Sequence, residues 1–250
     1  MAKASEGRPR ALESMGAQVR PEQYGAPKPW TLSPTDLTFL WDECPRCFYN
    51  KVALGRPRPR APFPRVFGLI DRAMKDFYLG ARAETLVPGM APGVIVDGDR
   101  WVKTAPIVPP GASSSLVIRG RVDVLVACDD GTTAVVDFKT VEPGPAAMEK
   151  YARQLHAYAA ALEHPARGPA TTVSALGLVC FLPDRFQVAE DRAVLRGGLE
   201  WIAVPRDDGA FEALLGQVAS VLAPAEPPPP APGCAWCARD RQIPRRYCAT

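Results

Sequence analysis

The strongest constraint on the fold is a pair of apolar segments joined by a turn sequence. Residues 115–128 and 132–141 are both rich in Val and other large apolar residues, and Asp129-Asp130-Gly131 separates them. Two β-branched segments on either side of such a turn predict an antiparallel β-hairpin. This hairpin is the clearest β-structure in the sequence, and the charged residues within it are the first candidates for chemistry.

Three charged side chains interrupt the apolar strands of this hairpin. Asp137 and Lys139 are two residues apart, so both point to the same face of a strand. Asp123 lies in the facing strand, between Val122 and Val124. Burial of such charges without partners is costly, whereas two carboxylates can bind a hard divalent cation. A lysine beside them can activate the attacking water or stabilise charge on a phosphate. The alternative is a surface ion pair across two antiparallel strands.

A helix is predicted directly after the hairpin, because residues 146–164 are Ala-rich and contain neither Gly nor Pro. Gln154 and Tyr158 are four residues apart, so they share one face of this helix and can reach a site behind the hairpin. An N-terminal helix is predicted to begin at Ser33-Pro34 and to break at Pro45. The periodicity also predicts helices at 66–80 and 211–222, strands at 171–182 and 198–204, and one strand near 94–96 or 101–102.

The combined motif resembles the RecB-like branch of the PD-(D/E)XK nuclease superfamily. Its residues in this chain, in the family's order and approximate spacing, are Asp123, Asp137, Lys139, Gln154 and Tyr158. The segment 32–55, with its Cys-Pro dipeptide, is similar to the family's N-terminal segment. The resemblance implies an α/β fold with a mixed central sheet flanked by helices. It also implies Mg²⁺- or Mn²⁺-dependent cleavage of DNA, with Asp71 at the place of a metal-binding histidine found in many members.

Five of the seven cysteines form a pattern that indicates a metal site. Cys44-x-x-Cys47 lies near the start of the chain, and Cys234-x-x-Cys237 and Cys248 lie near its end. Paired C-x-x-C sequences suit tetrahedral Zn²⁺ or an iron–sulfur cluster. Cys128 and Cys180 lie in apolar strands, where we interpret both as small core residues.

The resemblance extends to nucleases of the AddB kind and to the CRISPR-adaptation exonucleases, which hold a [4Fe–4S] cluster. It implies a cluster bound by Cys44, Cys234, Cys237 and Cys248. The spacing leaves Cys47 open as an alternative ligand and Zn²⁺ as an alternative metal. Either metal would join the two ends of the chain and would act structurally.

The basic residues are expected to bind nucleic acid in two local groups. The N-terminal group is Arg56, Arg58, Arg60 and Arg65, and the C-terminal group includes Arg245 and Arg246. If a metal joins the chain ends, both groups fall on one phosphate-binding surface. The net charge is only +3, which excludes a histone-like polycation.

Three regions are expected along the chain. Residues 1–30 are predicted to be a flexible tail, 31–223 the nuclease core, and 224–250 a proline linker followed by the Cys-rich segment. The polar N-terminus lacks the apolar core of a secretory signal, and no apolar run approaches the roughly 20 residues of a membrane span. We therefore expect a cytoplasmic protein without a membrane partner.

These observations predict a metal-dependent DNA nuclease, with exonuclease action on single-stranded or free-ended DNA as the expected activity. DNA repair, recombination or CRISPR-type processing is the expected setting, with protein partners from such a complex. The alternative is a non-cleaving nucleic-acid-binding or scaffold protein with a structural metal.

Overall fold

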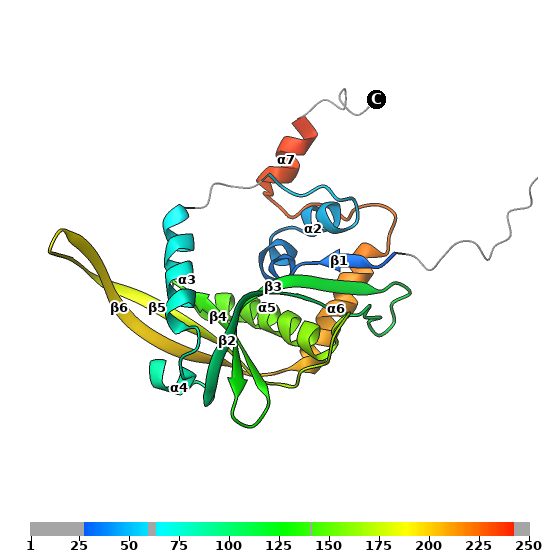
Figure 1. Cartoon of the computed structure of the whole chain (residues 1–250). Helices are drawn as coiled ribbons and strands as arrows, with labels where there is room; N and C mark the ends of the chain where they lie inside the picture. The colour runs from blue at the N-terminus through cyan, green and yellow to red at the C-terminus, as the bar shows by residue number, and fades with distance from the viewer. Residues whose placement is uncertain (1–27, 60–63, 141, 243–250) are drawn as a thin grey trace, which may run out of the picture.

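A six-stranded mixed sheet forms the centre of the molecule in the computed structural model, which describes residues 28–59, 64–140 and 142–242 (Figure 1). The strands are β1 (Trp30–Leu32), β2 (Gly93–Lys103), β3 (Leu116–Cys128), β4 (Thr133–Lys139), β5 (Val173–Ala189) and β6 (Arg192–Val204). Their order is β1-β3-β4-β5-β6, and β2 pairs with β3. The mixed sheet with flanking helices confirms the predicted α/β fold class.

Helices connect and cover these strands. They are η2 (Asp36–Leu40), α1 (Trp41–Glu43), α2 (Pro45–Val52), α3 (Arg65–Tyr78), α4 (Ala83–Leu86), α5 (Pro145–Glu163), α6 (Asp208–Leu222) and α7 (Ala235–Gln242). The helices predicted at 66–80, 146–164 and 211–222 correspond to α3, α5 and α6. The parts of the expected tail and Cys-rich segment that fall in 1–27 and 243–250 lie outside the described residues.

The predicted hairpin forms the centre of the sheet. β3 and β4 are antiparallel, with Val124 opposite Val136. β4 and β5 are parallel, and α5 connects them, so these three elements form a βαβ unit. In this unit, Asp137 and Lys139 lie at the C-terminal end of β4.

The sheet is covered on both faces. On one face, Leu155 and Leu162 of α5 pack on Val122, Val135 and Leu178. On the other face, residues of α3 and α4 pack on Val124, Val136 and neighbouring strand residues. The N-terminal helices pack with α6 in a third apolar cluster beside β1. The C-terminal end of β4 therefore lies between α5 and α3.

The N-terminal segment follows the predicted helix signals closely. The Ser33 amide donates a hydrogen bond to the Asp36 side chain (2.8 Å), and helical residues begin at Pro34. Cys44 interrupts the helix with an extended backbone (φ −167°, ψ 114°), and Pro45 is the first residue of α2. Cys44 therefore lies at the break, directly before α2, and Cys47 lies in the first turn of α2.

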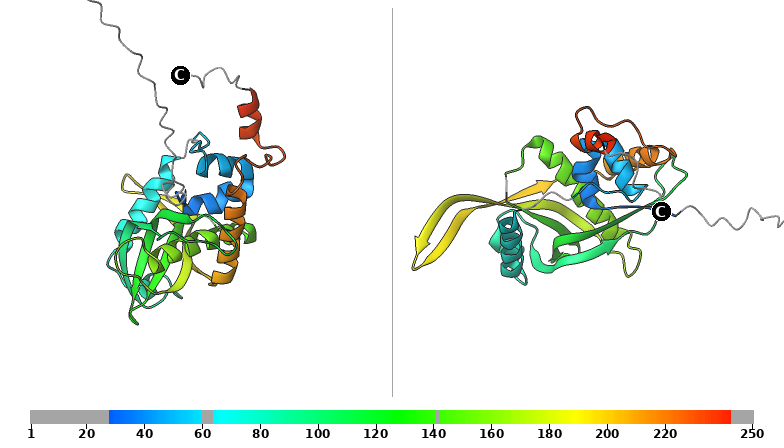
Figure 2. Two further views of the ribbon diagram at one scale, coloured as in Figure 1. Left: turned by 90° about the vertical axis from the view of Figure 1, so that its right-hand side faces the viewer. Right: turned by 90° about the horizontal axis from the view of Figure 1, so that it is seen from above.

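Strands β5 and β6 are much longer than the sequence predicts. They form a hairpin whose far part, around residues 183–197, projects from the body in the right-hand view of Figure 2. Their register shifts between Pro183 and Arg185, and Glu190 and Asp191 turn with positive φ. The strand expected near 94–96 or 101–102 is also longer, because β2 runs through both positions with an irregularity between Val96 and Gly98.

Candidate active site and cysteine cluster

Asp137 is the most deeply buried acid of the motif. Its side chain is 2% exposed, and it forms an ion pair with Lys139. Gln154 donates a hydrogen bond from Nε2 to Asp137 Oδ1 (3.3 Å), and the same nitrogen lies 3.3 Å from Tyr158 Oη. The strand and the helix therefore bring together four of the five motif residues that the sequence singled out.

Asp123 completes this group from the neighbouring strand. The pairing of Val124 with Val136 places Asp123 opposite Asp137. Burial raises the pKa of Asp137 to about 7, and the negative charge of Asp123 adds to this effect while Lys139 opposes it. Burial also acts to raise the pKa of Asp123, but Asp137 and Lys75 outweigh it and lower that pKa. Two like charges that share one site produce such opposite shifts, and a bound cation would favour the charged form of both carboxylates.

Lys75 is a residue of this site that the sequence did not identify. Its ammonium lies 2.9 Å from Asp71, 3.1 Å from Asp99 and 2.9 Å from Asp123. Burial acts to lower the pKa of Lys75, but the Asp123 charge outweighs it and raises that pKa well above its usual range. Asp71 and Lys75 are four residues apart on α3, and this spacing is the one local signal that could have pointed to the pair.

A cavity of about 580 Å³ opens beside these groups. Asp71, Asp123 and Lys139 supply its charged lining, and Phe67 and Tyr151 are among its aromatic residues. The Lys139 ammonium lies 4.7 Å from the centre of the Tyr151 ring, so the lysine is held between that ring and Asp137. The cavity is large enough to accept a phosphate group with a hydrated cation next to the carboxylates.

The fit of a divalent cation rests on the donor set. Asp123 and Asp137 offer carboxylate oxygens, the ligands that Mg²⁺ prefers together with retained waters. Asp71 faces the same cavity but is bound to Lys75, and the three carboxylates do not form a group with mutually close oxygens among the described residues. The pair Asp123 and Asp137 therefore fits the cation, with Asp71 further away.

The second predicted site is present as a compact cluster of four cysteines. The Sγ atoms of Cys44, Cys47, Cys234 and Cys237 all lie within 4.8 Å of one another. Three of these Sγ pairs are 3.5 to 3.7 Å apart. This is the alternative ligand set, with Cys47 included, whereas Cys248 lies outside the described residues.

Hydrogen-bond donors surround the cluster and suit thiolate sulfurs. The Ala231 amide lies 3.4 Å from Cys44 Sγ, and Arg58 Nη2 lies 3.8 Å from Cys234 Sγ. Burial acts to raise the pKa of Cys44, but hydrogen bonds led by that of Ala231 outweigh it and lower the pKa to about 6. Burial raises the pKa of Cys47 and of Cys237, so without a metal the cluster does not hold all four sulfurs as thiolates. Donors around metal-bound sulfurs are a common outer shell of such sites, so the environment as well as the donor set fits a metal.

The basic residues of the N-terminal group take different positions. Arg58 also forms an ion pair with Glu43, so it is directed to the cysteine cluster. Arg56 is exposed nearby, and Arg65 is the exposed first residue of α3. Arg60, Arg245 and Arg246 lie outside the described residues.

The comparisons with known proteins bear on this geometry. A family model of the PD-(D/E)XK nuclease superfamily matches residues 84–242, more than half of the chain. The chain belongs to the PD-(D/E)XK nuclease superfamily. The matched range contains Asp123, Asp137, Lys139, Gln154 and Tyr158, so the family match and the buried cluster coincide. A nuclease of this superfamily acts on DNA, with divalent metals as the usual cofactors.

Twelve chains of solved structures are similar to the protein. One of them, titled "Crystal structure of SSO0001", has a TM-score of 0.45 and 17% identity, and the alignment covers 80% of each chain. No curated protein matches the sequence. Among the described residues, every helix is too short or too polar to cross a membrane.

Proposed function

We propose that this PD-(D/E)XK protein is a cytoplasmic, Mg²⁺- or Mn²⁺-dependent deoxyribonuclease that removes nucleotides from single-stranded or free-ended DNA. The observation that carries the proposal is the buried Asp137, held between Lys139 and Gln154, next to the Asp123 and Lys139 side chains that line the cavity. A structural ion pair would not need the second carboxylate of Asp123 next to it. DNA repair, recombination or CRISPR-type processing, together with protein partners, is the setting that this activity suggests.

Each motif residue has a distinct role in this proposal. Asp123 and Asp137 would hold the cation, which would supply charge neutralisation at the scissile phosphate and a lowered pKa for a water molecule. Lys139 lies beside Asp137, where its ammonium orients the attacking water or stabilises negative charge on the phosphate. Gln154 fixes the Asp137 carboxylate, and Tyr158 keeps the Gln154 amide in place. Asp71 also lines the cavity, and Lys75 binds it.

The activity is tested with purified protein, Mn²⁺ and end-labelled oligonucleotides. Lys139→Ala and Asp137→Asn are expected to lose at least 100-fold in cleavage rate, because each removes a group at the reacting phosphate. Lys150→Ala is the matched control, because Lys150 lies on α5 outside the cavity lining. This variant should cleave at the wild-type rate. Cleavage by Lys139→Ala at the wild-type rate would refute the assignment.

The DNA substrates separate the finer alternatives. A linear single strand that is cleaved while a circular single strand survives would establish exonuclease action, and labels at the two ends would give its polarity. Equal cleavage of both would replace the exonuclease proposal with an endonuclease. Binding without cleavage at any Mn²⁺ concentration would favour the scaffold alternative.

The cysteine cluster is proposed to bind a metal that holds the chain ends together. Four sulfurs at 2.3 Å from one tetrahedral Zn²⁺ would be about 3.8 Å apart, close to the 3.5 to 3.7 Å of three Sγ pairs here and within the 4.8 Å limit for all pairs. This agreement supports one ion bound by Cys44, Cys47, Cys234 and Cys237. The resemblance supports the alternative [4Fe–4S] cluster, in which Cys248 would take the place of Cys47.

The two metal proposals predict opposite results for two variants. With a single zinc ion, Cys47→Ser loses the metal and Cys248→Ser keeps it. With the iron–sulfur cluster, Cys248→Ser loses iron and visible absorption, whereas Cys47→Ser keeps both. Elemental analysis and the visible spectrum of anaerobically purified protein decide between them.

A further inference from the structure

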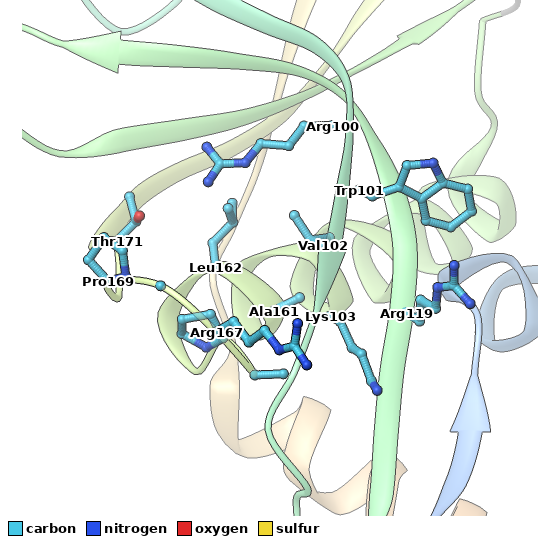
Figure 3. Close-up of a pocket in the computed structure, with 13 residues that line it drawn as sticks. Arg100, Trp101, Val102, Lys103, Arg119, Ala161, Leu162, Arg167, Pro169 and Thr171 are labelled. Atoms are coloured by element: carbon cyan, nitrogen blue, oxygen red, sulfur yellow. The ribbon is translucent and has the colours of Figure 1, made fainter.

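A second cavity lies away from the carboxylates, between β2 and the segment that follows α5. It has a volume of about 410 Å³ (Figure 3). Four basic residues contribute to its lining and no acidic residue does: Arg100, Lys103, Arg119 and Arg167. We call this site the Arg119 cavity. Its all-positive lining contrasts with the modest net charge of +3 for the whole chain.

Three of the four cationic side chains of this cavity are not neutralised by a carboxylate of the described residues. Lys103, Arg119 and Arg167 are exposed and form no ion pair there, whereas Arg153 and Arg206 each contact two carboxylates. Lys103 and Arg119 are also direct partners across β2 and β3. Like charges directly opposite one another destabilise a sheet, so this pair indicates a surface that binds an anion.

An exposed aromatic side chain accompanies these cations. Trp101 of β2 is 63% exposed, and the Arg119 guanidinium lies 4.8 Å from the centre of its ring. Figure 3 shows Trp101 and Arg119 together, on the opposite side of β2 from Arg167. A large exposed aromatic surface next to arginines is the combination that stacks on nucleic-acid bases while the cations bind phosphates.

The Arg119 cavity is connected to the active site by the strands and the helix that form both. Lys75, which contacts Asp123, also contacts Asp99, and Asp99 forms an ion pair with Arg121 (2.6 Å). Arg121 lies opposite Trp101 in the β2–β3 register. Along α5, Leu162 of the cavity follows Gln154 by eight residues, or about 12 Å of helix.

We propose that the Arg119 cavity and Trp101 bind the sugar–phosphate backbone of a nucleic-acid strand a few nucleotides away from the bond that is cleaved. The inference rests on the proposed nuclease function, and it adds a binding surface outside the catalytic cavity. The rise of about 12 Å along α5 from Gln154 to Leu162 corresponds to about three to four nucleotides of helical DNA, at 3.4 Å per nucleotide, and to fewer of an extended strand. The surface therefore recognises strands longer than this, and it contributes little to the binding of a mononucleotide.

The test compares binding with chemistry in the full chain. Arg119→Ala/Arg167→Ala and Trp101→Ala are the test variants, and Arg192→Ala, an exposed arginine at the far end of the β5–β6 hairpin, is the matched control. Fluorescence anisotropy without divalent metal measures the affinity for labelled oligo(dT) of 4 and 24 nucleotides and for dTMP. Hydrolysis of a p-nitrophenyl ester of thymidine monophosphate with Mn²⁺ measures the chemical step on a substrate too small to reach the cavity.

The double variant is expected to bind the 24-mer at least tenfold more weakly and to leave hydrolysis of the small ester unchanged. Its plot of log affinity against log salt concentration should lose about 1.4 in slope, since each lost phosphate contact on a single strand contributes about 0.7. Trp101→Ala should weaken 24-mer binding with little change in this slope, because stacking releases no counterions.

Unchanged 24-mer binding by the double variant, with Arg192→Ala as reference, would overturn the proposal. An equal loss of affinity for dTMP would also overturn it, because the cavity would then bind a mononucleotide alone. If the wild type hydrolyses neither DNA nor the ester, the nuclease function fails while the anisotropy data still decide the binding surface.

Discussion

Loss of one cluster cysteine is expected to destabilise the whole domain. Cys47 and Cys234 are 187 residues apart, so a metal between them closes a loop that contains most of the chain. The chain-entropy relation for a cross-link gives about 5 kcal/mol for a loop of this length. For a protein of 150 to 250 residues, 1 kcal/mol corresponds to about 2–4 °C in melting temperature. Cys237→Ser should therefore melt about 10–20 °C below the wild type.

A shift of this size follows when one lost ligand releases the metal and opens the loop. The linker makes part of its contact with α2 without the metal, because Arg46 Nε donates to Pro228 O (2.8 Å) and Tyr49 Oη to Pro224 O (2.7 Å). These two hydrogen bonds keep the C-terminal segment from detaching fully, and they place the result toward the lower end of the range. Each contributes only about 1 kcal/mol, well below the cross-link.

Thermal unfolding followed by circular dichroism, with metal analysis of each sample, measures the effect. Cys128→Ser is the control, since Cys128 is half-buried in β3 and lies outside the cluster. The double variant Cys47→Ser/Cys237→Ser should melt close to Cys237→Ser alone, because the same cross-link can be lost only once. Additive losses in the double variant, or a Cys237→Ser protein that keeps its metal and its melting temperature, would refute the cross-link.

Two further substitutions test the geometry of the active site. Lys75→Met removes the cation between three partly exposed carboxylates and should lower the free energy of unfolding by about 2 kcal/mol. In urea titrations Mn²⁺ should restore part of this loss, because it replaces the missing positive charge. Equal losses with and without Mn²⁺ would contradict this reasoning. Gly120→Ala places a Cβ 2.7 Å from Pro34 and 3.0 Å from the Tyr158 ring. It should therefore lower the free energy of unfolding by about 1–3 kcal/mol and slow cleavage. Wild-type stability and activity would show that Pro34 and Tyr158 adapt to the added methyl group.

The motif residues could be found from the sequence because their positions depend on local geometry. Alternation along a strand places Asp137 and Lys139 on one face, and a four-residue interval on a helix does the same for Gln154 and Tyr158. Asp123 follows from the short turn, which fixes the register of β3 against β4. The cysteine pairs were found for the same reason, since the C-x-x-C interval is itself local.

The remaining features depend on contacts that local patterns do not encode. Lys75 and Asp99 meet Asp123 because α3 packs over the sheet, and no spacing in the sequence relates the three. The far part of the β5–β6 hairpin was missed because Pro183 and the glycines at 197 and 198 are typical of a break. In the structure, Pro183 lies at a register shift and the strands continue past it. β1 has three residues, too few for a period to be recognised.

The cysteine cluster and the active site share one structural support, the N-terminal segment. Cys44 and Cys47 lie at the start of α2, and the same segment begins with Pro34, which packs against Gly120 of β3. A Cβ added at Gly120 would lie 3.0 Å from the ring of Tyr158, and Tyr158 contacts the Gln154 amide that binds Asp137. A metal that fixes α2 thereby holds the far end of this chain of contacts. Loss of the cross-link is therefore expected to slow cleavage by shifting Tyr158, although no cysteine of the cluster binds the catalytic cation.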